Sequence, residues 1–328
     1  MKKRTTIKDV AKKAETSVSV VSYVLNNTPG KTISDATKKR VLDAADSLNY
    51  IPNSAAQNLR TGNTKTIALF AFWNTDDRAY TTFLKGLTYT ANKFGYTVML
   101  CDSASPSKQK IKRIVARLMP SAVIVLMSGS PYINYKEEDI ISALGSIKLP
   151  SLIINGERSY KDKNIDSINL GFYESSYAAT EYLINKGCKK IAYIKPKEDF
   201  MNENYRIKGY EAALSKNGLN GHSVVSEENI EKLFSKNLPD GIVANKSENG
   251  YLALKMAKKY KISVPSKLKV IAANTENFAN YTDPPLTTVA LPLEEIGQSA
   301  AIKVINKLNE KEIKLPKLKY DIIKRESV

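Results

Sequence analysis

Histidine and cysteine, two residue types on which many enzymes depend, are scarce in this chain of 328 residues. Its one histidine, His222, falls in a segment whose composition indicates a loop, which leaves little for a Ser-His-Asp triad or a histidine-rich metal site. The glycine-rich phosphate loops G-x-G-x-x-G and G-x-x-x-x-G-K-[S/T] are absent. The Tyr-x-x-x-Lys pair of short-chain dehydrogenases occurs six times, as chance produces in a chain rich in both residues. We therefore expect no enzymatic activity, no metal and no cofactor.

The composition favours a cytoplasmic protein with two or three domains. Hydrophobic residues make up 42% of the chain, enough for sizeable cores, and no stretch approaches the roughly 18 apolar residues of a membrane span. Two cysteines, Cys101 and Cys188, suit a reducing compartment, and no apolar signal segment opens the sequence. The net charge of +17 is compatible with a nucleic-acid partner but is only weak support for one, because the Lys-rich body holds most of the excess.

Three short helices are predicted within the first fifty residues. Each follows a Thr or Ser that can cap its first turn, namely Thr6, Ser17 and Ser34. Apolar residues recur on one face of each helix at helical spacing. These inward positions are Ile7, Val10, Ala11 and Ala14, then Val21, Val24 and Leu25, then Val41, Leu42, Ala45 and Leu48.

Two helices joined by a turn of about three residues, with a third packed across them, form a helix-turn-helix motif. The second helix of such a motif enters the major groove of DNA, so its outer residues would face the bases. Here those outer residues are Val18, Ser19, Ser22 and Tyr23. A small helical bundle without a ligand is the alternative.

From Lys65 onward, apolar strands alternate with helices, which is typical of a parallel α/β fold. The first series of strands is expected at 67–72, 97–101, 122–127 and 151–154, and the second at 166–169, 191–194, 241–244 and 270–273. The helices between them are expected at 80–94, 107–118, 137–147, 173–187, 204–217 and 247–260. Two doubly wound units imply two lobes, with a ligand site in the cleft at the carboxyl ends of the strands. Phe72, Trp73 and Phe172 lie near strand ends, where they could stack on a ligand or pack in a core.

Several segments resemble the LacI/GalR family of repressors. TIKDVAKKA, SVSVVSYVLNN and YIPNSAAQNLRTG resemble the family's DNA-binding headpiece, and DPPLTTV, LPLEEIG and the terminal RESV resemble its regulatory domain. The resemblance implies an all-α helix-turn-helix headpiece and an α/β, two-lobed, periplasmic-binding-protein-like domain of two doubly wound parallel sheets. The expected domains are a headpiece at 1–50, a hinge helix and linker at 51–63, and a regulatory domain at 64–328. Its N-lobe would comprise 64–158 and 291–317, and its C-lobe 159–290 and 318–328.

The resemblance also implies which residues meet DNA. Val18, Ser19 and Tyr23 occupy base-reading positions, and Ala56 and Leu59 match residues that press into the minor groove. The full expected set is Thr6, Ser17, Val18, Ser19, Ser22, Tyr23, Asn26, Asn53, Ala56, Gln57, Leu59 and Arg60. A hinge helix of about eight residues is too short to be stable alone, so it would order only in a dimer on DNA. Leu59 as an ordinary apolar linker residue is the alternative.

Two headpiece residues depart from the family pattern. Members commonly have Arg where this chain has Tyr23, and Arg is the usual reader of guanine, so the operator sequence is expected to differ. The family's turn glycine is replaced by Glu15. Either Glu15 adopts a positive φ at a cost of about 1 kcal/mol, or the turn has another shape.

The resemblance implies an effector site as well. Arg206 matches the family's effector-binding arginine, although a surface salt bridge is an alternative role. Asn155 and Asn274 stand where the family often has Asp, which removes negative charge and leaves room for a phosphorylated or acidic ligand. Asn245 lies near a family motif that aligns only with a one-residue insertion. The expected effector residues are Phe72, Trp73, Asn155, Phe172, Arg206, Asn245 and Asn274.

The sequence therefore favours a homodimeric transcriptional repressor that binds a pseudo-palindromic operator in double-stranded DNA and no membrane. Its effector would be a small molecule of the sugar or sugar-phosphate class. The alternatives are a degenerate cleft regulated by a non-sugar ligand or a protein partner, an α/β enzyme with an accessory DNA-binding domain, and a secreted sugar-binding protein. The last would need a signal peptide and would have no use for the headpiece.

Overall fold

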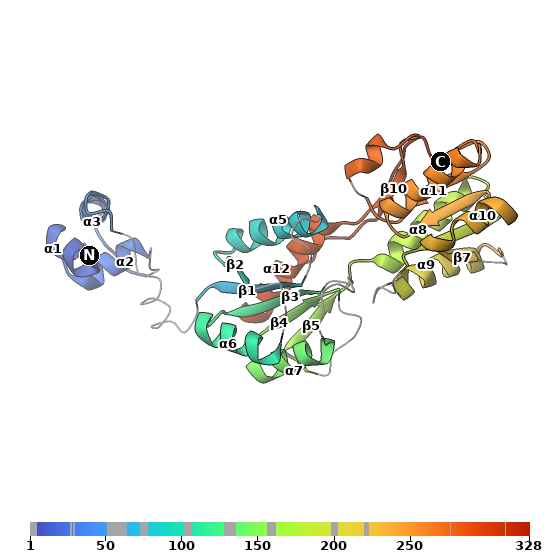
Figure 1. The fold of residues 1–328 in the computed structure, drawn as a ribbon. Coiled ribbons are helices and arrows are strands. Elements are labelled where there is room, and N and C mark those ends of the chain that lie inside the picture. Colours follow the sequence, from blue (N-terminus) through green and yellow to red (C-terminus); the bar gives the residue numbers. More distant parts are fainter. Residues whose placement is uncertain are drawn as a thin grey trace. The chain divides into compact units, whose positions relative to one another are not determined.

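The chain forms two compact units, residues 1–64 and residues 65–328 (Figure 1). This computed structural model describes residues 5–26, 28, 30–50, 64–72, 78–101, 107–127, 136–155, 162–197, 203–219, 223–275, 277–311 and 313–328. The predicted site residues Asn53, Ala56, Gln57, Leu59, Arg60 and Trp73 lie outside the described residues.

The first unit contains the three predicted helices, α1 (Ile7–Lys13), α2 (Val18–Leu25) and α3 (Asp35–Ser47). The backbone N–H and the hydroxyl of Thr6 both donate to Asp9 Oδ2, at 2.8 and 2.7 Å. Ser17 Oγ accepts from the Val20 N–H at 3.2 Å, and Ser34 Oγ accepts from the Thr37 N–H at 3.3 Å. Local side-chain bonds thus satisfy donors at the helix starts, which is why these starts could be predicted.

A small apolar core holds the three helices together. Its buried members are Val10, Ala11, Ala14, Val21, Val41, Ala44 and Ala45. The prediction that Leu42 faces this core is wrong. Its side chain is 49% exposed. The apolar stripe of α3 runs through Val41, Ala44 and Ala45 at helical spacing, and Leu42 projects about 100° away from Val41.

Glu15 lies in the turn between α1 and α2 with φ of +50°. The following Thr16 N–H donates to the Ala11 carbonyl at 3.0 Å, which closes the turn after α1. The turn therefore keeps the left-handed backbone that favours glycine, and Glu15 adopts it despite its Cβ.

We expect Glu15→Gly to stabilise the first unit by about 1 kcal/mol, because glycine adopts a positive φ without steric cost. Amide hydrogen exchange in the full chain, followed on peptides from α1 and α2, measures this as slower exchange of the buried amides. Asn49→Gly is the matched control: Asn49 has φ of +46°, but asparagine tolerates this region, so the gain there should be smaller. Faster exchange in Glu15→Gly would contradict the strain argument.

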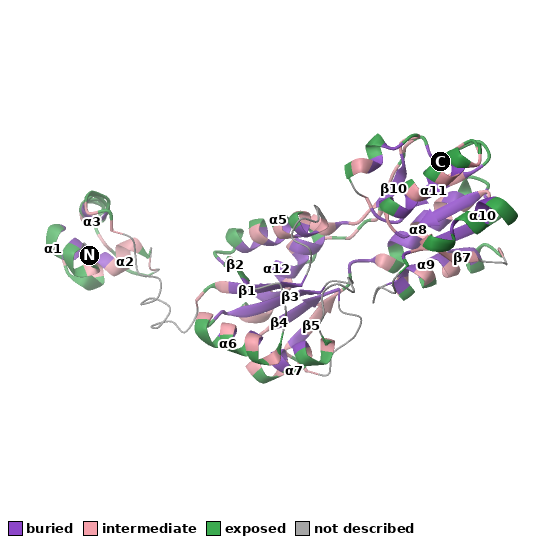
Figure 2. Cartoon of the chain, in the orientation of Figure 1, coloured by how far each residue is buried: buried purple, intermediate pink, exposed green. Residues whose placement is uncertain are grey.

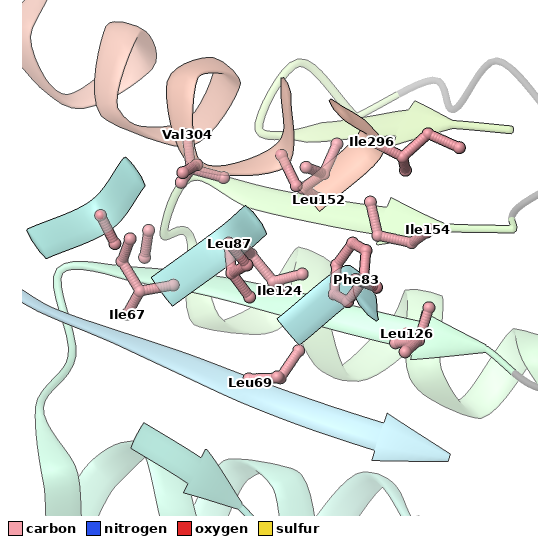
Figure 3. Close-up of a cluster of buried hydrophobic side chains, with 14 of the residues drawn as sticks. Ile67, Leu69, Phe83, Leu87, Ile124, Leu126, Leu152, Ile154, Ile296 and Val304 are labelled. Carbon is pink, nitrogen blue, oxygen red and sulfur yellow. The ribbon is translucent and has the colours of Figure 1, made fainter. Parts of the chain in front are cut away.

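The first sheet of the second unit contains five parallel strands in the order β2-β1-β3-β4-β5. They are β1 (Thr66–Phe72), β2 (Thr97–Cys101), β3 (Ala122–Met127), β4 (Ser151–Ile154) and β5 (Ile165–Ile168). Helices α5 (Arg78–Lys93) and α12 (Leu293–Asn309) cover one face, and α6 (Lys108–Leu118) and α7 (Glu137–Ile147) cover the other. In Figure 3, Phe83 and Leu87 of α5 and Ile296 and Val304 of α12 pack over Ile124 and neighbouring strand residues.

The second sheet has six strands in the order β11-β10-β9-β8-β6-β7, parallel except for β11 against β10. They are β6 (Ile191–Lys195), β7 (Ser223–Ser226), β8 (Gly241–Ala244), β9 (Lys269–Ala272), β10 (Thr287–Ala290) and β11 (Asp321–Ile323). Helices α8 (Phe172–Asn185) and α9 (Glu203–Lys216) cover one face, and α10 (Glu231–Lys236) and α11 (Ser247–Lys259) cover the other. Figure 2 shows strands of both sheets buried (purple) and the outer helix faces exposed (green).

The prediction that residues 166–169 begin the second series of strands is wrong. β5 pairs with β4 in the first sheet, in the register Ser151↔Ile165 to Ile154↔Ile168. Only Ile165 of this strand is buried, so its sequence carries no pattern that could assign it to a sheet.

The chain also crosses between the two lobes twice near its carboxyl end. It leaves β10 of the second sheet, forms α12 on the first lobe, and returns to the second sheet as β11. α12 lies so close against α5 that a Cβ at Gly297 would overlap the Phe83 carbonyl. None of the described helices is long and apolar enough to cross a membrane.

Candidate effector site and DNA-reading surface

Helix α2 buries one side in the first unit and exposes the other. Val21 is fully buried, whereas Ser17, Val18 and Ser19 at the start of the helix are exposed. Ser22 and Tyr23 are half-buried. The predicted base-reading residues therefore lie on the accessible part of the helix that the helix-turn-helix motif places in the major groove.

Tyr23 contacts the segment that follows α2. Lys31 Nζ lies 5.3 Å from the centroid of its ring, and its carbonyl accepts from the Thr28 N–H at 3.0 Å. Asn26 Nδ2 donates to Ser22 Oγ at 3.2 Å, so two predicted DNA contacts bond to each other. This cation over the ring places a positive charge beside one of the expected base-reading residues.

Three of the predicted effector residues converge at one edge of the second sheet. Arg206 lies on α9, which follows β6, while Asn245 follows β8 and Asn274 follows β9. These three strands are neighbours in the sheet, so their carboxyl ends meet. Parallel pairing thus gathers residues that lie up to 68 positions apart in the sequence.

Arg206 is a buried cation, with a side chain only 3% exposed. Its guanidinium lies over the Phe172 ring, with Cζ 4.0 Å from the ring centroid, and its Nη1 donates to the Ala273 carbonyl at 3.4 Å. Burial lowers the pKa of Arg206 below its usual value, and nearby Tyr193 and Glu203 oppose that shift. The surface salt bridge considered for Arg206 therefore does not fit its surroundings.

Glu203 is a buried carboxylate that no motif or spacing in the sequence indicates. It lies one helical turn before Arg206 on α9 and is 4% exposed. Its Oε1 accepts from the Tyr193 hydroxyl at 2.6 Å, and its Oε2 accepts from Asn245 Nδ2 at 3.2 Å. Asn249 Nδ2 in turn donates to Asn245 Oδ1 at 2.8 Å. We call Tyr193, Glu203, Asn245 and Asn249 the Glu203 cluster.

Asn274 and Phe172 are the remaining candidates near the second sheet. Asn274 Oδ1 accepts from the Thr275 N–H at 2.8 Å, and the Asn274 carbonyl accepts from Ser247 Oγ at 2.9 Å. Phe172 packs both against the core of the first lobe and against Arg206. Its ring already stacks on a cation, which gives it a role in positioning Arg206.

Two predicted effector residues belong to the first sheet. Asn155 follows β4 with φ of +67°, is 5% exposed, and donates from Nδ2 to the Met127 carbonyl at 3.1 Å. Phe72 ends β1 and is 1% exposed, inside the cluster that α6 and α7 form with the sheet. Its position favours core packing, the alternative role considered for it.

The described residues contain no group of three His, Cys, Asp or Glu side chains that could hold a metal ion. Cys101 and Cys188 are both buried, and burial raises the pKa of each thiol to about 11. Both effects disfavour the thiolate, which is the form in which a cysteine reacts.

Comparison with known proteins decides the family. Residues 6–53 match the model of the bacterial regulatory proteins of the lacI family, and residues 180–328 match that of the periplasmic binding protein-like domain. The HTH-type transcriptional regulator RegA of Clostridium saccharobutylicum is 30% identical over 339 residues, covering 98% of this chain and 99% of RegA. The chain belongs to the LacI/GalR family of transcriptional regulators.

Other LacI/GalR proteins resemble it over the same length. The HTH-type transcriptional repressor PurR of Aliivibrio fischeri is 29% identical over 342 residues, covering 98% of each chain. The lac repressor dimer bound to operator and the anti-inducer ONPF has a TM-score of 0.77 at 19% identity, covering 99% of each chain. At this low identity, the likeness to the lac repressor shows a shared fold only.

Membership in the LacI/GalR family fixes the general function. The protein is a transcriptional repressor regulated by a small-molecule effector, and it acts as a dimer on operator DNA. It is a regulator and not an enzyme.

Proposed function

We propose that the effector is a small molecule of the sugar or sugar-phosphate class, bound at the carboxyl edge of the second sheet. The observation that carries this proposal is the environment of Arg206. Within the described part of the chain, one of its five N–H donors makes a hydrogen bond, and the ring of Phe172 holds the guanidinium in place. A buried, oriented fork of donors suits vicinal hydroxyls or an anionic oxygen.

The amides around Arg206 support the same ligand class. Asn245 and Asn274 are both less than 10% exposed and follow neighbouring strands, so each offers polar atoms at the edge where Arg206 lies. Asn155 stands in the equivalent place at the carboxyl end of β4 in the first sheet. We propose that closure of the two lobes over the ligand brings the two edges together.

A thermal-shift screen of sugars, sugar phosphates and nucleobases tests this proposal. A ligand that binds the folded protein raises the melting temperature by mass action, so hits among sugars or their phosphates are expected. Hits confined to nucleobases would contradict the proposal and identify the effector as a nucleobase. No hit in any class would favour the alternative of a cleft regulated by a protein partner.

On the DNA side, we propose that Val18, Ser19 and Tyr23 read bases while residues 51–63 form the hinge helix and linker. Two equivalent recognition helices in a two-fold dimer match a pseudo-palindromic operator. Effector binding would shift the lobes and change the separation of the paired hinge helices, which alters operator affinity. Effector and operator sites would then be coupled through the linker.

A further inference from the structure

Glu203 and Arg206 are the two charged side chains that are buried within the described residues of the chain. Every other Lys, Arg, Asp or Glu whose side chain the structure describes is at least partly exposed. The two lie three residues apart on α9, so they project from the same side of one helical turn. Burying a charge is costly unless an opposite charge or hydrogen bonds compensate it.

The hydrogen bonds of the Glu203 cluster all point toward the carboxylate. Asn249 donates to Asn245, Asn245 donates to Glu203, and the Tyr193 hydroxyl donates to Glu203 from the other side. Burial and the neighbouring carboxylate raise the pKa of Tyr193 well above its usual value, so the phenol keeps its proton and remains a donor. Such a chain of donors polarises toward its acceptor and favours negative charge on it.

We infer that Glu203 is a specificity-determining residue, which cancels the charge of Arg206 so that the site selects an uncharged ligand and rejects a phosphorylated or carboxylated one. This inference rests on the proposed function. Of the two ligand classes proposed there, it retains the neutral sugars and excludes the sugar phosphates. It reverses the expectation that replacing Asp by Asn155 and Asn274 makes room for an anion. The negative charge missing at those two positions is supplied by Glu203.

Two other cations lie near this edge of the sheet. Lys195 ends β6 and Lys246 precedes α11, and both are partly exposed. Solvent screens charges at such positions, whereas the buried pair interacts at a lower effective dielectric. Lys195 and Lys246 are also unchanged in every variant below, so differences between variants report on Glu203.

Calorimetric titration of the full-length dimer with inorganic phosphate tests the inference directly. Glu203→Gln is expected to bind phosphate at least about tenfold more tightly than the natural chain, because it removes a negative charge beside Arg206. Glutamine can keep the hydrogen bonds, since reorienting the amides of Asn245 and Asn249 restores their pairing. Equal phosphate affinity in Glu203→Gln and the natural chain would overturn the inference.

Two control variants separate charge from structure. Glu203→Asp keeps the charge but shortens the side chain, and Tyr193→Phe removes one hydrogen bond to the carboxylate while leaving its charge. Both are expected to bind phosphate as weakly as the natural chain. If either gains phosphate affinity as Glu203→Gln does, loosening of the site and not charge is responsible, and the inference fails.

A measurement on the natural chain alone covers the case in which Glu203→Gln does not fold. A neutral sugar found in the thermal-shift screen is compared with its own phosphate ester, and the sugar is expected to bind at least about tenfold more tightly. Tighter binding of the ester would overturn the inference but leave the proposed ligand class intact. If neither binds and phosphate affinity still rises in Glu203→Gln, the proposed ligand class fails while the role of Glu203 stands.

Discussion

Val21→Asn is expected to weaken operator binding by more than about a thousandfold, the range that separates specific from non-specific binding. Val21 is 0% exposed and belongs to a core with seven buried members among the described residues of the headpiece. An amide there loses apolar burial and leaves polar groups without partners, which together cost several kcal/mol in so small a unit. Fluorescence anisotropy with labelled operator measures the loss.

The same substitution at an exposed leucine is the matched control. Leu42→Asn changes a side chain that is 49% exposed in the same unit, so operator affinity should change less than about threefold. Effector binding should be unchanged in both variants, because residues 65–328 form a separate compact unit. Operator binding that survives Val21→Asn would contradict the assignment of the headpiece as the DNA-binding part.

Arg206→Lys is expected to weaken effector binding by about a hundredfold, although the positive charge is kept. Lysine cannot present the planar fork of donors, and its compact ammonium stacks less well on the Phe172 ring. Because the charge beside Glu203 remains, the fold should be preserved. Titration with a ligand from the screen measures the affinity, and operator binding without effector should not change.

A substitution between lysine and arginine elsewhere on α9 provides the comparison. Lys208 lies two residues along the same helix with an exposed side chain, so Lys208→Arg should leave effector affinity unchanged. Comparable losses in Arg206→Lys and Lys208→Arg would show that α9 tolerates no change of cation. That result would remove the specific role assigned to Arg206.

The headpiece could be predicted almost entirely from the sequence because its determinants are local. Caps such as Ser17 and Ser34 act within three residues, and the stripe through Val21 and Val41 follows helical spacing. The prediction for Leu42 is wrong because Val41, Ala44 and Ala45, at positions i, i+3 and i+4, form the buried stripe, which leaves position 42 at its outer side. The sequence allows either a positive φ at Glu15 or a turn of another shape, and the structure shows the positive φ.

The candidate effector site could be predicted only in part. Arg206, Asn245 and Asn274 are expected there from the family resemblance, and adjacent parallel strands bring them to one edge of the second sheet. Glu203 and Tyr193 carry no signal in the sequence, since a glutamate at a helix start is usually exposed and only its burial distinguishes it. Similarly, β5 has one buried residue, so its place beside β4 depends on pairing that its own sequence does not encode.

The effector site and the operator site of this chain are expected to be coupled, and paired binding titrations measure that coupling. Effector affinity is measured with and without saturating operator, and operator affinity with and without saturating effector. Coupling predicts that both affinities change by the same factor, because linkage between two binding sites is reciprocal. An effector that binds equally well to free and operator-bound protein would contradict the claim.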